Sequence, residues 1–163
     1  MITIRALRAE DFMPWLALWQ GYQCFYQTTI DDNTTGESFR RLLSRAEPMH
    51  CLVAEQDGAM VGLVHFLTHR STWTQGDYCY LQDLYVSEAA RGLGAGKALI
   101  LAVYEQAEKL GCSRVYWLTQ ASNSHARALY YRLAQQTDFV QYRHFIRSAI
   151  IFPGCHGGRP PRA

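Results

Sequence analysis

Alternating hydrophobic and polar positions mark the strands of this chain. Residues 2–7 alternate as ITIRAL, and two apolar runs, residues 50–55 and 59–67, flank the dipeptide Asp57-Gly58. An Asp-Gly pair between such runs predicts a tight β-hairpin, because both central residues of that turn need a positive φ. Further runs rich in aromatic and β-branched residues predict strands over residues 78–86, 114–119 and 140–151.

Hydrophobic residues three and four positions apart mark the helices. Trp15, Leu18, Trp19 and Tyr22 share one face of the first predicted helix. The polar stretch TTIDDNTTGE that follows predicts a loop, and Gly111 is placed to cap the end of the third helix. The helices are predicted over residues 11–25, 38–45, 98–110 and 124–133. The order β-α-α-β-β-β-α-β-α-β indicates an α/β fold whose sheet begins antiparallel and then gains parallel crossovers.

Composition narrows the class of protein. The 163 residues are 48% hydrophobic and 18% charged, which is typical of a globular protein. We expect a single domain over residues 1–152 and a flexible C-terminal tail over residues 153–163. The net charge is +2 with no basic block, which gives nucleic-acid binding little support. Five cysteines without a CxxC pair, a charged N-terminus and the lack of a long apolar run predict a cytoplasmic protein away from membranes.

The stretch RGLGAGKALI places three glycines just before the third predicted helix. A P-loop is excluded because Ala98 follows Lys97 where Ser or Thr is needed, and Arg91 stands where its first glycine belongs. A dinucleotide-binding turn is excluded because the spacing is GxGxG and Arg114 occupies the region of the required acidic residue. The remaining pattern, RxxGxG, suits a pyrophosphate cradle at a helix N-terminus, with a flexible capping turn as the alternative.

A second motif follows the strand RVYWLTQ. Asn123, Ala126 and Tyr130 form the pattern NxxAxxxY. With RxxGxG before it, this order resembles the GNAT superfamily of acyl-CoA-dependent N-acetyltransferases over about residues 50–147, and YLQDLYV resembles its histone- and polyamine-acetylating branch. The resemblance implies the GNAT fold, a mixed central sheet with parallel strands splayed at the acetyl-CoA site and helices on its faces. It also implies acetyl-CoA as co-substrate, no metal, and a homodimer paired through the C-terminal strand.

The resemblance assigns roles to individual residues. The main chain of residues 84–86 would bind pantetheine, the turn would bind the pyrophosphate, and the helix motif would face the cofactor. Tyr130 would be the general acid, since it lies on the same helix stripe as Asn123 and a phenol is protonated at neutral pH. Leu84 N–H is a further candidate, as an oxyanion donor. The full cofactor set is Leu84, Tyr85, Val86, Arg91, Gly92, Leu93, Gly94, Ala95, Gly96, Lys97, Asn123 and Ala126.

The base and the acceptor site are less determined by the motifs. Gln82 replaces the Glu of the resembling branch and cannot take up a proton, so it could align a water relay, or the amine could arrive neutral and need no strong base. The neighbouring Asp83 is another candidate base, although adjacent strand residues point to opposite faces. Tyr80, which shares a face with Gln82, is a further candidate. On the acceptor side Tyr26, Asp31 and Asp32, together with Tyr80, suit a cationic amine such as a polyamine or lysine. Alternatively, the aromatic residues of the first helix belong to the core and these acids are solvated.

His65 and His69 resemble an HxxxH metal pair. On a strand they lie about 13 Å apart, too far for one zinc ion, so His65 is expected to be a hydrogen-bonded core or site residue.

These patterns predict an enzyme that transfers an acetyl group from acetyl-CoA to a primary amine. Direct attack in a ternary complex is expected, because no cysteine lies in either motif to carry the acetyl group. The alternatives are a non-catalytic acyl-CoA-binding sensor or partner-binding module on the same fold, a lysine or N-terminal protein acetyltransferase, and, more distantly, a nucleotide-dependent enzyme.

Overall fold

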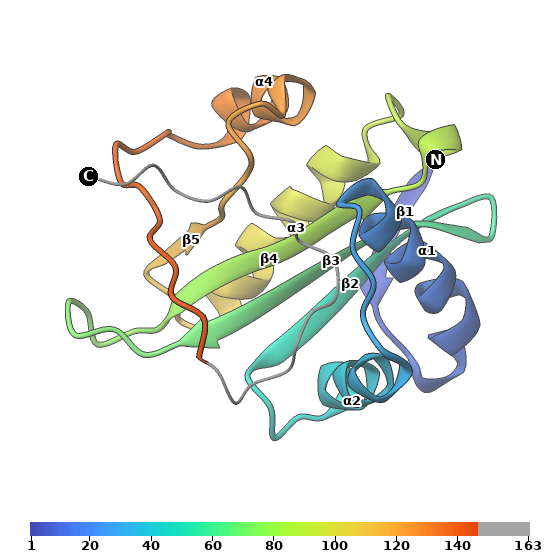
Figure 1. Ribbon diagram of the computed structural model, residues 1–163, viewed down its shortest axis with the longest axis horizontal. Helices are drawn as coiled ribbons and strands as arrows, with labels where there is room; N and C mark the ends of the chain where they lie inside the picture. Colours follow the sequence, from blue (N-terminus) through green and yellow to red (C-terminus); the bar gives the residue numbers. More distant parts are fainter. Residues whose placement is uncertain (147–163) are drawn as a thin grey trace.

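The computed structural model describes residues 1–146 and shows a central sheet with helices on both faces (Figure 1). Its strand order is β1-β2-β3-β4-β5. Neighbours pair antiparallel from β1 to β4, and β4 pairs parallel with β5, as the sequence predicts. The strands are β1 (Ile2–Ala6), β2 (Met49–Gln56), β3 (Ala59–His69), β4 (Tyr78–Val86) and β5 (Arg114–Tyr116).

Helices cover the two faces of the sheet separately (Figure 1). One apolar cluster joins the sheet to α1 and α2, and a second joins it to α3. The central strands are therefore buried on both faces, which explains why β2 and β3 read as continuous apolar runs. The helices are α1 (Phe12–Phe25), α2 (Asp32–Leu43), α3 (Ala95–Lys109) and α4 (Ser124–Leu133), with short 3₁₀ turns η1 (Ala9–Asp11) and η2 (Glu88–Ala90). Within residues 1–146, none of the helices has both the length and the hydrophobicity needed to cross a bilayer.

The structure confirms the hairpin and three of the four helices that the hydrophobic pattern predicts. Asp57 and Gly58 have φ angles of 51° and 80°, as the predicted two-residue turn between β2 and β3 requires. Gly111, with φ 73°, follows the end of α3, and α4 has the predicted bounds. The sheet begins at one edge with β1, which pairs with β2 from Ile2–Gln56 to Ala6–Leu52.

The second helix begins earlier than the polar composition of its first turn predicts. It starts at Asp32, inside the stretch expected to be a loop. Asp31 explains the difference, because its side chain caps the helix by accepting hydrogen bonds from Thr34 N and Thr34 Oγ1, both at 2.8 Å. Packing of Thr35 and Phe39 into the core then stabilises a first turn with poor intrinsic helix propensity.

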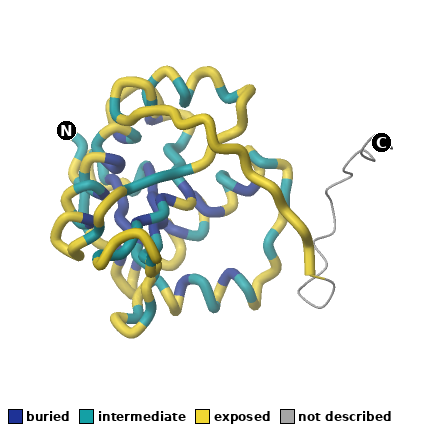
Figure 2. The backbone as a smooth tube through the Cα atoms, turned by 90° about the vertical axis from the view of Figure 1, so that its left-hand side faces the viewer, coloured by how far each residue is buried: buried dark blue, intermediate teal, exposed yellow. Residues whose placement is uncertain are grey.

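The end of the chain departs from the predicted sheet. Strand β5 stops at Tyr116 rather than at residue 119, and residues 140–146 form no strand. Figure 2 shows the segment leading to residue 146 as an exposed tube beside the buried sheet. A strand forms only where a neighbouring edge takes up its backbone hydrogen bonds, and no strand among residues 1–146 pairs with this segment. The rest of the predicted strand and the expected tail, residues 153–163, lie outside the described residues.

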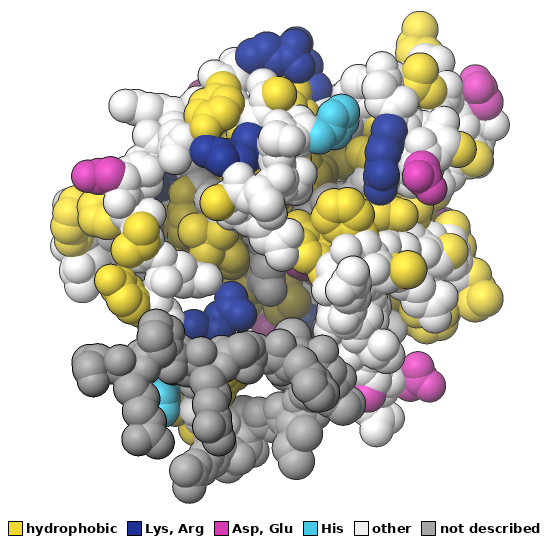
Figure 3. Space-filling model, turned by 45° about the horizontal axis from the view of Figure 1, so that its top comes forward, with side chains coloured by type: hydrophobic (Ala, Val, Ile, Leu, Met, Phe, Trp, Pro, Cys, Tyr) yellow, Lys and Arg dark blue, Asp and Glu magenta, His cyan; other side chains and the backbone are white. Residues whose placement is uncertain are grey.

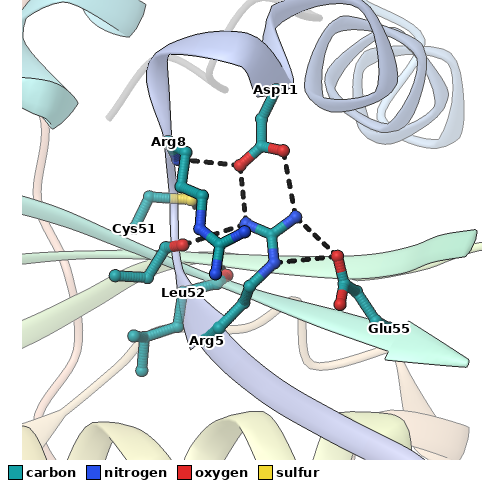
Figure 4. A network of polar contacts seen from close by, with 7 residues as sticks. Arg5, Arg8, Asp11, Cys51, Leu52 and Glu55 are labelled. Atoms are coloured by element: carbon teal, nitrogen blue, oxygen red, sulfur yellow. Dashed lines mark hydrogen bonds and ion pairs between the residues drawn. The ribbon is translucent and has the colours of Figure 1, made fainter. Parts of the chain in front are cut away.

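An ion network fastens β1 to β2 and η1 (Figure 4). The Arg5 guanidinium donates to both oxygens of Asp11, at 2.6 and 2.9 Å, and to Glu55 Oε1 at 2.8 and 2.5 Å. Asp11 also accepts from the backbone N–H of Arg8 at 2.7 Å. The Arg5 hydrogen bond lowers the pKa of Asp11, so the pair is ionised at neutral pH. The network fixes the direction in which the chain enters α1.

Two helical glycines should respond to alanine with opposite signs. A Cβ on Gly21 would lie 2.6 Å from Tyr85 Oη, whereas a Cβ on Gly36 would meet nothing within 4 Å. We expect Gly36→Ala to stabilise the protein by up to about 1 kcal/mol through helix propensity. Gly21→Ala must displace the Tyr85 ring or α1 and should destabilise it by about 1–2 kcal/mol. Urea unfolding of both variants measures the difference; an equal gain for both would contradict close packing of α1 on β4.

Candidate functional site

Divergence of β4 from β5 opens the candidate site. The two strands pair only from Tyr78–Arg114 to Tyr80–Tyr116, so the second half of β4 has β3 as its one strand neighbour among residues 1–146. A cleft of about 690 Å³ lies here between the end of β4, the start of α3, α4 and the end of α1. Its walls hold the cofactor residues predicted from the sequence, Leu93 excepted: Leu84, Tyr85, Val86, Arg91, Gly92, Gly94, Ala95, Gly96, Lys97, Asn123 and Ala126. Tyr26 and Tyr130 line the same cleft.

The glycine turn ends at the N-terminus of α3. Gly92 and Gly94 have φ angles of 79° and 87°, a left-handed conformation that L side chains rarely adopt, and Gly94 is the N-cap of the helix. The first N–H groups of α3 therefore face the cleft without intrahelical partners. Arg91 and Lys97 add positive charge to the wall. Leu93 differs from its neighbours, since its side chain is exposed and does not line the cleft.

Arg91 folds across the opening of the cleft. Its Nε donates to the backbone oxygen of Val86 at 3.3 Å, and its guanidinium lies 5.8 Å from the Phe25 ring and 5.9 Å from the Tyr85 ring. Basic side chains and a histidine stand among hydrophobic ones on the face that carries α4 and this turn (Figure 3). Unpaired helix N–H groups, positive φ angles and nearby cations together make a site for an anionic phosphate group.

Helix α4 presents one stripe to the cleft. Asn123 caps it, with Oδ1 accepting from the Ala126 N–H at 3.4 Å, and Ala126 and Tyr130 follow along the same face. The Tyr130 ring packs on Trp117 with centroids 5.3 Å apart. Burial raises the pKa of Tyr130 to about 12, so its phenol is protonated at neutral pH and can donate a proton. Tyr131, by contrast, is exposed and bonded to Arg127 and Gln136.

A β-bulge in β4 corrects the expected orientation of Asp83. His65 pairs with Asp83 and Phe66 with Leu81, which leaves Gln82 as the extra residue. The strict alternation assumed from the sequence therefore breaks at Gln82. Leu81 packs on the α3 side, whereas Asp83 lies on the α1 side, where it meets His65. Gln82 is exposed, so Asp83 takes the buried place on the acceptor side that the sequence did not give it.

Tyrosines surround the Asp83 carboxylate. Burial and, after it, the charge of Asp83 raise the pKa values of Tyr22, Tyr26 and Tyr80. Tyr26 in turn raises the pKa of Tyr130, although less than burial does. The predicted acid and the repositioned carboxylate thus flank one aromatic wall.

The other predicted acceptor-side acids lie elsewhere. Both oxygens of Asp31 bond to Thr34, and Asp32 is exposed in the first turn of α2. Tyr22, which shares one face of the first predicted helix, and Phe25 at the end of that helix also line the cleft. Sequence reasoning left out five further cleft residues: Ala90, His125, Ala128, Leu129 and Arg132. The positions of Leu129 and Arg132 next to Tyr130 on α4 could have indicated these two.

The profile of the acetyltransferase (GNAT) family matches residues 9–134 of this chain. The chain belongs to this family. The protein is therefore an acetyl-CoA-dependent N-acetyltransferase. Its sheet has the antiparallel start and parallel end expected from the resemblance.

Named relatives agree with the GNAT assignment. The D-amino-acid N-acetyltransferase HPA3 of Saccharomyces cerevisiae is 34% identical over 144 residues, covering 87% of this chain and 89% of that protein. The thialysine N-epsilon-acetyltransferase of Bos taurus is 37% identical over 95 residues, covering 53% of this chain and 55% of that protein. The crystal structure of ribosomal-protein-alanine N-acetyltransferase from Brucella melitensis biovar Abortus 2308 superimposes with a TM-score of 0.72 at 25% identity, covering 90% of this chain and 100% of that one.

The residues of the cleft fit acetyl-CoA. The glycine turn and the start of α3 would hold its pyrophosphate, and the edge of β4 would hold pantetheine between Asn123 and Leu84. Acetyl-CoA supplies the activated acetyl group as a thioester. Within residues 1–146, no three His, Cys, Asp or Glu side chains come together as a metal site would need. His65 and His69 both lie on strand β3, as expected.

Two glycines of the turn should respond differently to alanine. Gly94→Ala places a side chain at φ 87°, which costs about 1–2 kcal/mol, and reorients the N–H groups at the start of α3. We expect the Kd for acetyl-CoA to rise about tenfold or more. A Cβ on Gly96 would meet Leu129 at 3.8 Å and Val86 at 3.9 Å, which are ordinary contacts. Gly96→Ala should leave the Kd nearly unchanged in calorimetric titration. Equal losses in the two variants would contradict this account of the turn.

Proposed function

We propose that the protein transfers the acetyl group of acetyl-CoA to the primary amine of a small cationic compound, by direct attack in a ternary complex. An amino-acid or lysine-like amine suits the site better than a polyamine. The Asp83 carboxylate carries this proposal: it is buried, it lies among tyrosines, and His65 is the one basic side chain within 4 Å of its oxygens among residues 1–146. A buried carboxylate is costly without a cation, and the ammonium group of an acceptor supplies one.

The distribution of acids supports one ammonium subsite rather than a row of them. Asp31 is used to cap α2, and Glu37 pairs with Arg40 and Arg41 on the surface of the same helix. A polyamine has several positive charges, whereas an amino acid or thialysine has fewer. Two relatives named above act, by their names, on a D-amino acid and on thialysine.

Each proton of the reaction has a named residue in this proposal. Asp83 binds the ammonium group and takes one of its protons, which frees the lone pair on nitrogen. That nitrogen forms a bond to the thioester carbon, with Leu84 N–H placed to donate to the oxygen on which negative charge develops. The carbon–sulfur bond then breaks, and Tyr130 gives its proton to the departing thiolate of coenzyme A. The nitrogen, which after the attack carries one proton more than an amide does, gives that proton to the Tyr130 phenolate and so restores the phenol, and solvent removes the proton held by Asp83.

The raised pKa of Tyr130 leads to a prediction of how the rate of acetyl transfer depends on pH. Because burial raises this pKa to about 12, the phenol keeps its proton well above neutral pH. We expect kcat, measured with both substrates saturating, to show no alkaline decline between about pH 6 and about pH 10, because the phenol keeps its proton and the bound ammonium group is deprotonated by Asp83. Initial rates at saturating acetyl-CoA and amine across this range check the expectation. A decline in kcat centred below about pH 10 would contradict Tyr130 as the proton donor.

An amine panel tests the proposal. Purified protein is incubated with acetyl-CoA and with D- and L-amino acids, thialysine, ornithine, spermidine, an aminoglycoside and a lysine peptide, and the products are identified by mass spectrometry. Acetylation of one amino-acid-like amine supports the proposal, and a preference for spermidine would overturn its acceptor class. A preferred peptide would favour protein acetylation. Binding of acetyl-CoA without any product would favour the sensor function.

We also propose that the protein is a homodimer that exchanges its C-terminal segment. Phe139, Val140, Tyr142 and Phe145 are exposed in a segment that pairs with no strand among residues 1–146. Beside the open edge of β5 lies a groove of about 490 Å³ whose walls include Tyr104 and Val115. An apolar segment and an open edge in one chain suit pairing between two copies. Light scattering should give about twice 18.6 kDa, and Phe139→Asp with Phe145→Asp should give monomer; a monomeric wild type would overturn the proposal.

A further inference from the structure

A row of hydrogen bonds leads from the core to the acceptor side of the site. The indole nitrogen of Trp15 lies 3.0 Å from Nε2 of His65, and Nδ1 of His65 lies 3.0 Å from Oδ2 of Asp83. Trp15 is completely buried, and His65 and Asp83 are 5% and 9% exposed. The row joins α1, β3 and β4, and it ends at the carboxylate that the β-bulge at Gln82 turns toward the tyrosines.

Chemistry fixes where the proton of His65 lies. An indole N–H can only donate, so Nε2 of His65 must accept from Trp15. A neutral imidazole with one accepting nitrogen carries its proton on the other, so Nδ1–H donates to Asp83. A second proton on Nε2 would point at the indole N–H. His65 therefore stays neutral as long as the Trp15 contact holds, and it has no free nitrogen with which to take a proton from a substrate.

Packing holds the imidazole ring in this orientation. The ring of Trp15 lies 6.0 Å from that of His65, and the ring of Trp19 meets it edge to face at 4.9 Å. A rotation of His65 would break both hydrogen bonds inside this aromatic cluster. Asp83 is consequently held through Oδ2 by His65, and a hydrogen bond with the carboxylate contributes to the raised pKa of Tyr22.

We propose that His65 is a positioning residue for acetyl transfer. The hydrogen bond from Trp15 confines His65 to the Nδ1–H tautomer. The Nδ1–H group of His65 then holds Oδ2 of Asp83, so that Oδ1 faces the amine. This inference rests on the proposed function, in which Asp83 binds the acceptor ammonium group. It excludes His65 itself as the base, although a buried histidine beside a carboxylate is a common arrangement for one.

Two substitutions at His65 separate positioning from packing. In asparagine, Nδ2 is attached to Cγ as Nδ1 is in histidine, so His65→Asn keeps a donor for Asp83. His65→Leu fills similar space and has no donor. The control is His50→Leu: His50 is partly buried on β2 and stacks on Phe66, a member of the α3-side cluster, at 5.0 Å. All three variants are assayed for kcat and for KM with both substrates, using the amine that the panel identifies.

The expected result is a selective loss. His65→Leu should lower kcat/KM for the amine about 10–100-fold with KM for acetyl-CoA unchanged, and His65→Asn should restore most of it. His50→Leu should leave kcat/KM for the amine near the wild-type value. Full activity in His65→Leu, or an equal loss in His65→Asn, would overturn the positioning role.

A spectroscopic measurement on the wild type keeps the inference testable if the variants fold poorly. ¹⁵N NMR of the resting protein near neutral pH should show His65 with Nδ1 protonated and Nε2 unprotonated. An Nε2–H tautomer or an imidazolium would overturn the inference while leaving the proposed function in place. The wild type could show the expected tautomer while Asp83→Asn still acetylates the amine at the wild-type rate. That combination would overturn the role of Asp83, and with it the positioning role of His65.

Discussion

Tyr130→Phe is expected to lower kcat by a factor of about 10²–10⁴ with little change in the Kd for acetyl-CoA. The substitution removes only the hydroxyl, so the ring keeps its contact with Trp117 and its place on the α4 stripe. The loss arises because the thiolate of coenzyme A must then leave without a proton from the protein. Steady-state kinetics with the identified amine and calorimetric titration of acetyl-CoA measure the two quantities.

The adjacent tyrosine provides the matched control. Tyr131 is exposed, and its hydroxyl bonds to Arg127 at 2.6 Å and to Gln136 at 2.8 Å. Tyr131→Phe should keep kcat within about twofold of the wild type, because surface substitutions away from special features change little. Equal kcat values for wild type and Tyr130→Phe would show that the thiolate leaves unprotonated or takes its proton from water. A tenfold weaker Kd in Tyr130→Phe would assign the hydroxyl to binding.

Asp11→Ala is expected to lower the free energy of unfolding by about 3 kcal/mol. The side chains of Arg5 and Asp11 are 18% and 8% exposed. Without Asp11 the Arg5 guanidinium would lose its bidentate partner, and because the site is largely buried, water could not fully replace the lost hydrogen bonds. Arg8 N–H and the start of α1 would lose their acceptor as well (Figure 4). Chemical denaturation near neutral pH measures the difference.

The difference in unfolding free energy between wild type and Asp11→Ala should depend on pH, because the pKa of Asp11 is lowered in the folded protein. Its stabilising contribution is present above the pKa of an unfolded aspartate, about 3.9, and is lost as the pH falls through the lower folded value. Wild type and Asp11→Ala should therefore converge in stability as the pH falls below about 3.9 and through the lowered pKa of folded Asp11. Glu37→Ala is the control, since Glu37 pairs with Arg40 and Arg41 on an exposed helix face, and its loss should barely change the unfolding midpoint. A gap that persists at low pH would mean that Asp11 stabilises by packing alone.

Sequence by itself determined the parts of this protein that depend on neighbouring residues. The Asp57-Gly58 turn needs positive φ angles at two successive residues, and the glycine turn needs positive φ angles at Gly92 and Gly94. Helix α4 follows from local spacing, and that spacing also brings Asn123 and Tyr130 to one side of the cleft. The family motifs are local in the same sense, which is why they identify an acetyl-CoA-dependent acetyltransferase without a structure.

Tertiary structure decided what depends on partners far apart in the chain. The bulge at Gln82 shows only in the pairing of β4 with β3, and it reverses the face that alternation gives to Asp83. Trp15, His65 and Asp83 come from three elements, so their hydrogen bonds cannot be read from spacing. Local patterns set backbone conformation, but the partner of a side chain is fixed only when distant elements pack together.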